Sequence, residues 1–109
     1  MICNAGIRLI EVYEPNAFIT NANAEEDLTI YLPQPFTGRQ YQVLQLSGFE
    51  IVLHTNSEET FFLTSKRAKK LRLEGSPDTI GKCLTIESYL GKWRVSSSTF
   101  NDSQLTFEE

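Results

Sequence analysis

The chain has 109 residues, of which 40 % are hydrophobic and 22 % are charged. This composition is that of a globular protein and excludes a disordered, collagen-like or coiled-coil chain. The length fits one domain over residues 1–109. Ten Lys and Arg against fourteen Asp and Glu give a net charge of −4. A protein that wraps nucleic acid needs a basic surface, so we expect no specific nucleic-acid partner.

The sequence predicts neither a membrane span nor a metal site. No stretch approaches the 18 or so apolar residues of a spanning helix, and the first residues do not resemble a signal peptide. Two cysteines, Cys3 and Cys83, and one histidine cannot supply the four or so ligands of a structural zinc site. We expect no cofactor and two buried or half-buried thiols, and we leave open whether the thiols pair.

Alternating apolar and polar residues, separated by turn residues about every ten positions, predict strands along the whole chain. In chain order these strands cover residues 7–13, 17–20, 27–32, 39–46, 49–54, 60–64, 71–74, 82–87 and 92–96, with a last segment in 99–107. No window of eleven or more residues has the spacing of an amphipathic helix. The expected fold is all-β, a small sandwich or barrel-like domain of about eight or nine short, mostly antiparallel strands with negligible helix.

The alternation also predicts which side chains face the core. The residues expected to point inward from two of the strands are Leu28, Ile30, Leu32, Phe49, Ile51 and Leu53. Gly38 is expected to allow a reversal that returns the chain as a partner strand. Ser47 and Gly48 are expected to form the tight turn of a hairpin between residues 39–46 and 49–54.

Residues with catalytic chemistry are few. His54 is the single histidine, and the acidic residues gather in two loop segments, 25–27 and 58–59. Neighbouring acids in one loop do not have the opposed geometry of a glycosidase pair, nor the spacing of a calcium loop. We expect solvated acids, a histidine at a polar strand end, and no catalytic residues.

Half of the basic residues lie within residues 66–72. They are Lys66, Arg67, Lys69, Lys70 and Arg72. One interpretation is a surface that docks onto an acidic partner. The other is an exposed connection kept soluble by charge, with lysines that discourage unwanted strand pairing.

Three segments carry a family resemblance. The residues DLTIYLP at 27–33, GRQY at 38–41 and GKWRVS at 91–96 resemble a module of bacteriophage virion appendages, over residues 27–96 in all. Such modules occur in tail and head fibres and are similar to small capsid decoration (cement) proteins. The resemblance implies a homotrimer, partners such as the major capsid protein or other virion proteins, and location in the virion after synthesis in the host cytoplasm.

We therefore expect a non-enzymatic virion structural protein, a trimeric capsid decoration protein that stabilises the phage shell. The short chain and the basic residues at 66–72 favour decoration over a fibre. Trp93 is expected to cover either the core or, with Tyr89, a seam between subunits. The alternative is a tail or head fibre, or a receptor- or glycan-binding appendage module, in which Tyr31, Tyr41 and Tyr89 stack on sugars.

Overall fold

The computed structural model describes residues 6–9, 16–22, 26–32, 38–55, 62, 68–89 and 91–109. The strands of this part of the chain are β1 (Gly6–Leu9), β2 (Asn16–Thr20), β3 (Leu28–Leu32), β4 (Gln40–Leu44), β5 (Ile51–Thr55), β6 (Lys70–Leu73), β7 (Cys83–Tyr89), β8 (Lys92–Ser98) and β9 (Leu105–Glu108). Two short 3-10 turns accompany them, η1 (Pro77–Thr79) and η2 (Asp102–Gln104). The predicted all-β class is confirmed. In the described residues no helix has the length and apolar character needed to cross a membrane.

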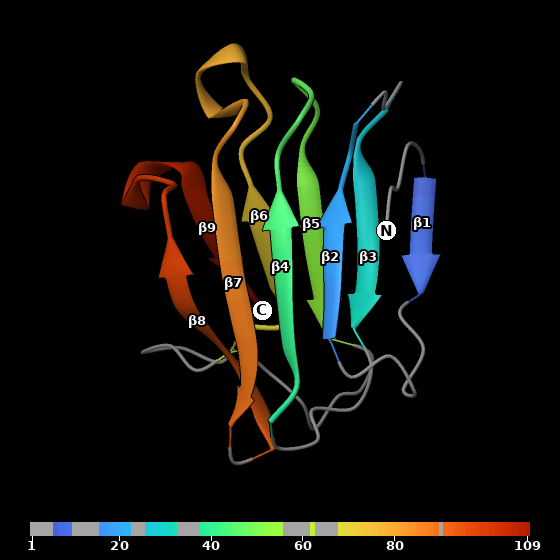
Figure 1. The fold of residues 1–109 in the computed structure, drawn as a ribbon, viewed down its shortest axis with the longest axis vertical. Coiled ribbons are helices and arrows are strands. Elements are labelled where there is room, and N and C mark those ends of the chain that lie inside the picture. Colours follow the sequence, from blue (N-terminus) through green and yellow to red (C-terminus); the bar gives the residue numbers. More distant parts are fainter. Residues whose placement is uncertain are drawn as a thin grey trace.

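The strands form two sheets that pack face to face (Figure 1). The five-stranded sheet has the order β1-β3-β5-β6-β9, and the four-stranded sheet has the order β2-β4-β7-β8. Strands that alternate apolar and polar residues present one apolar face each, and two such faces cover one another in a sandwich. The sandwich is therefore the architecture that this pattern produces.

The first half of the chain winds between the two sheets. Successive strands from β1 to β5 alternate between the five-stranded and the four-stranded sheet, so neighbours within each sheet are parallel. Gly6 lies beside Leu28, and Leu28 lies beside Ile51. Each full turn thus takes about 23 residues, in the manner of a short solenoid in which each coil stacks on the one before it.

The second half of the chain is antiparallel. β6 pairs with β5 and β9, and β7 pairs with β4 and β8. Among the described strands, these four antiparallel pairings outnumber the three parallel ones, in agreement with the expected mostly antiparallel strands.

Two predicted reversals are wrong. β3 and β4 lie in different sheets, as do β4 and β5, so neither pair forms a hairpin. Gly38 does take a positive φ of 91°, but the chain that follows crosses to the facing sheet. The physical reason is that turn residues allow a change of direction without specifying the partner strand. Six residues between β4 and β5 are enough to cross the roughly 10 Å between packed sheets.

The core contains side chains from both sheets. Its fully buried large members are Trp93, Tyr41, Phe62, Ile19, Leu28, Ile30, Leu32, Ile51, Leu53, Leu71 and Leu73. The Tyr41 and Trp93 rings pack with centroids 5.4 Å apart. Five of the six predicted inward residues are buried. Phe49 is wrong, because it lies in the connection before β5 and is 37 % exposed.

Gly75 marks a close approach between two connections. A Cβ atom at Gly75 would lie 2.3 Å from the backbone N of Glu50 and 2.3 Å from the backbone C of Phe49. Real side chains do not tolerate such distances to backbone atoms, so the connection between β4 and β5 can pack here only against glycine. Gly48 in the same region has nothing within 4 Å of its Cβ position.

This difference predicts unequal effects of two matched substitutions. Gly75→Ala should lower the free energy of unfolding by about 1–3 kcal/mol, since the backbone of residues 49–50 must shift to admit the methyl group. Gly48→Ala should change it by less than about 1 kcal/mol. Urea denaturation followed by circular dichroism measures both; equal effects would contradict the close approach.

Candidate functional site

Of the basic residues at 66–72, the structure describes Lys69, Lys70 and Arg72. Lys66 and Arg67 lie outside the described residues. Lys70 and Arg72 project from the outer face of the five-stranded sheet, because the intervening Leu71 and Leu73 point into the core. Arg72 forms ion pairs with Glu50 and Glu108. Its positive charge is thereby compensated.

The aromatic residues expected at a subunit seam lie in different environments. Trp93 is fully buried in the core of its own chain, which leaves none of its surface for a neighbouring subunit. Tyr89 is 47 % exposed, and the guanidinium of Arg94 lies 5.1 Å from the centre of its ring. Arg94 also forms an ion pair with Glu87.

The three tyrosines considered for sugar stacking do not form one surface. Tyr41 is fully buried. Tyr31 is half-buried on the outer face of the five-stranded sheet, where its ring centroid lies 4.9 Å from that of His54. Tyr89 belongs to the other sheet, on β7.

Cys83 is an exposed free thiol at the start of β7. The expectation of a buried or half-buried thiol is therefore wrong for Cys83, because side chains alternate along β7 and the buried Leu84 leaves Cys83 on the outer face of the sheet. Cys3 lies outside the described residues. Within the described residues no group of three or more His, Cys, Asp or Glu is placed to hold a metal ion.

A buried pair of amides organises one end of the sandwich. Asn21, which follows β2, and Gln45, which follows β4, are both completely buried. The Nδ2 atom of Asn21 donates to Oε1 of Gln45 at 2.6 Å. Gln45 Nε2 donates to the carbonyl oxygens of Phe49 at 2.8 Å and Glu74 at 3.0 Å. The side-chain oxygen Oδ1 of Asn21 accepts from the backbone N–H of Leu46 at 2.8 Å.

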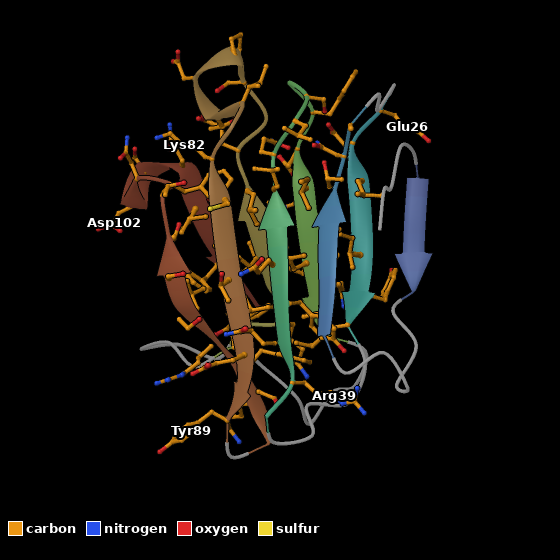
Figure 2. All side chains as sticks on the ribbon, viewed as in Figure 1. Glu26, Arg39, Lys82, Tyr89 and Asp102 are labelled. Atoms are coloured by element: carbon orange, nitrogen blue, oxygen red, sulfur yellow. The ribbon has the colours of Figure 1, made fainter. Side chains whose placement is uncertain are left out.

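Further hydrogen bonds, most of them between backbone groups, join the same connections. The backbone N–H of Gln45 donates to the carbonyl of Lys82, and Gly81 donates to the carbonyl of Gln45 at 2.7 Å. The carboxylate of Asp27 accepts from the backbone N–H of Glu50 at 2.9 Å. We call the described residues 21–22, 26–27, 45–50 and 74–82 the loop end. Figure 2 shows Glu26 and Lys82 at this end, and Arg39 and Tyr89 at the opposite end.

Three large apolar side chains are exposed at the loop end. Leu46 is 41 %, Phe49 37 % and Ile80 50 % exposed. Each lies on or beside a backbone group that is hydrogen-bonded to Asn21 or Gln45. The N–H of Leu46 donates to the side chain of Asn21, the carbonyl of Phe49 accepts from the side chain of Gln45, and the N–H of Gly81, next to Ile80, donates to the carbonyl of Gln45. Loops held by a rigid scaffold are the usual position of binding residues, and large exposed apolar side chains mark interaction sites when they gather.

The loop end is acidic around these apolar side chains. It contains five acidic residues, Glu26, Asp27, Glu50, Glu74 and Asp78, and one basic residue, Lys82. Glu50 is paired with Arg72, and the ammonium group of Lys82 donates to Oε1 of Gln104 at 3.0 Å. Glu26, Asp27, Glu74 and Asp78 remain exposed. The arrangement suits recognition of a protein surface by apolar contact within an acidic rim.

Sequence reasoning missed the loop end, although one signal for it was present. Gln45 continues the alternation of the inward residues Tyr41 and Val43, so period-2 spacing places its side chain on the core face. A glutamine at such a position requires partners for its amide. Leu46 and Phe49 could be read as ordinary strand residues, so their exposure depends on where β4 ends and β5 begins.

Comparisons with known proteins found no matching family model, no significantly similar curated protein and no significantly similar solved structure.

The buried amide pair predicts that alanine substitutions at two nearby glutamines, Gln45 and Gln42, have very different effects on the free energy of unfolding. Gln45→Ala should lower the free energy of unfolding by about 3 kcal/mol, since it leaves buried carbonyl and amide groups without partners. Gln42→Ala should cost less than about 1 kcal/mol, because Gln42 is exposed on β4. Equilibrium urea unfolding of the two variants provides the comparison, and a Gln45→Ala cost near that of Gln42→Ala would rule out a structural role for the amide pair.

Proposed function

We propose that this chain is a non-enzymatic structural protein of a bacteriophage particle, a capsid decoration protein that stabilises the shell by binding its subunits. The resemblance of residues 27–96 to virion appendage modules supports the class. The observation that carries the binding role is the loop end, where Leu46, Phe49 and Ile80 are exposed on connections held by buried hydrogen bonds. A fixed apolar surface of this kind loses little conformational entropy when a partner covers it.

The proposal includes a homotrimer. Among the described strands, β1 and β2 each pair on one side, and both lie at the same side of the sandwich (Figure 1). Strand edges without a partner strand are commonly covered in assemblies by neighbouring subunits. Symmetric association would cover the edges of all three chains in the same way.

A receptor- or glycan-binding appendage module is the second candidate. The observation that favours it is the half-buried Tyr31 and His54 ring pair on the outer face of the five-stranded sheet. Lys70 is the cross-strand neighbour of His54 in the register of this sheet. An aromatic face beside hydrogen-bonding and cationic groups could stack on an acidic sugar.

Particle binding tests the proposed function directly. The purified chain, mixed with phage shells that lack it, should sediment with the shells and saturate at a fixed ratio to the shell subunits, and should raise the temperature at which the shells break. The control is the same chain mixed with host cells. Binding to cells and not to shells would replace the decoration role with the receptor-binding one.

The trimer has its own measurement. Sedimentation equilibrium at micromolar concentration should give a mass near three chains, and dilution should lower the melting temperature, because folding and association are then coupled. A monomer whose melting temperature does not depend on concentration would refute the trimer and leave the particle-binding proposal standing.

A further inference from the structure

We infer that the loop end is the surface through which this chain docks, and that its partner is a protein segment with apolar side chains flanked by lysines or arginines. The inference rests on the proposed structural role and names the surface that carries it. It differs from the expectation drawn from the sequence, which placed the partner-binding charges at residues 66–72 and made the partner acidic.

The first step of the argument is rigidity. Asn21 and Gln45 hold the ends of β2 and β4 together and bind the carbonyls of Phe49 and Glu74. Glycine at position 75 lets residues 48–50 pack directly against the connection between β6 and β7. The hydroxyl of Thr79 donates to the carbonyl of Glu74 at 2.8 Å. The apolar side chains are thus presented by a preorganised backbone, which reduces the entropic cost of binding.

The second step is charge complementarity. The apolar side chains of Leu46, Phe49 and Ile80 lie among five acidic residues and one basic residue. The charge of Glu50 is paired with Arg72. Lys82 keeps its positive charge, because its partner Gln104 is a neutral amide, but the four exposed acids Glu26, Asp27, Glu74 and Asp78 outnumber it and form an acidic rim. Such a rim attracts a basic surface and repels an acidic one, and it sets partner choice through the encounter rate.

The same rim argues against a second copy of the chain on this surface. Two loop ends related by a two-fold axis would bring their acidic rims together, and like charges placed opposite one another oppose binding. Arg72 offers no compensating charge to a second copy, because Glu50 and Glu108 already engage it. A different protein with a basic border around apolar side chains is the better complement.

The apolar part is tested by matched substitutions measured against shells that lack the chain. Replacing Leu46, Phe49 and Ile80 together by Ser should weaken shell binding by about tenfold or more, since truncation of central apolar contacts removes much of the binding energy. Tyr89→Ser, an exposed aromatic at the opposite end, should change binding by less than about twofold. Circular dichroism and melting curves confirm that both variants fold. Equal binding of the triple variant and the native chain overturns the inference.

The charged part uses two variants with the same change in net charge. Glu26→Lys with Asp78→Lys should weaken binding and slow association, and added salt should reduce this difference because exposed charges are screened beyond about 8 Å. Glu87→Lys with Glu109→Lys, of which Glu87 lies toward the Tyr89 end of β7 and Glu109 follows β9, is the control and should have a small effect. Lys69→Gln with Lys70→Gln tests the basic residues. Loss of binding in that variant alone would return the partner surface to residues 66–72.

A synthetic peptide tests the docking surface independently of the phage particle. A short peptide with a Leu-Phe-Leu centre and lysines on both sides should shift the backbone NMR signals of residues 45–50 and 74–82, and a peptide with glutamates in place of the lysines should not. Shifts elsewhere, or equal shifts with both peptides, overturn the inference.

If shells fail to bind but the lysine peptide maps to the loop end, the decoration role fails and the docking surface stands. Conversion of an oligomer to monomers by the triple serine variant would instead identify a self-association surface and overturn the assignment.

Discussion

The burial of two amide side chains, Asn21 and Gln45, is the constraint on which the loop end depends. A buried amide is costly unless its donors and acceptors are satisfied. Here each amide bonds to the other and to backbone groups of the connections beside it. The connections that follow β2, β4 and β6 are thereby held together at one end of the core. The exposed apolar side chains therefore stand on connections that are held by the hydrogen bonds of these two amides.

Charge is distributed unevenly over the same framework. Acidic side chains gather around the exposed apolar residues of the loop end, while Arg72 on the outer face of the five-stranded sheet is compensated by Glu50 and Glu108. Partly exposed ion pairs of this kind contribute little to stability. Their effect on binding is larger. They neutralise the positive charge of Arg72 on the outer face of the five-stranded sheet, so the exposed acidic side chains dominate the electrostatic potential at the loop end.

The winding of the first five strands explains why local patterns predicted the elements better than their pairing. Alternation over β3 places Leu28, Ile30 and Leu32 in the core whichever strand lies beside it. Neighbouring strands along a chain pair in most proteins, which favours a hairpin reading of a turn such as Ser47-Gly48. In this chain the strand after the turn joins the facing sheet, and Leu28 pairs with Ile51, which lies 23 residues further along the sequence. No local pattern contains that information.

By itself the sequence determined the all-β class, the approximate positions of most described strands along the chain, and five of the six residues that it placed in the core, because period-2 alternation is a property of each strand alone. The spacing of Gln45 from Tyr41 and Val43 contained a signal that Gln45 faces the core, but sequence reasoning missed it. Tertiary structure decided the parallel pairing, the burial of Trp93, the exposure of Phe49 and the site formed around the amides. The physical reason is separation along the chain: Asn21 meets a partner 24 residues away and Gln45 one 29 residues away. Such contacts form only when two sheets share one core.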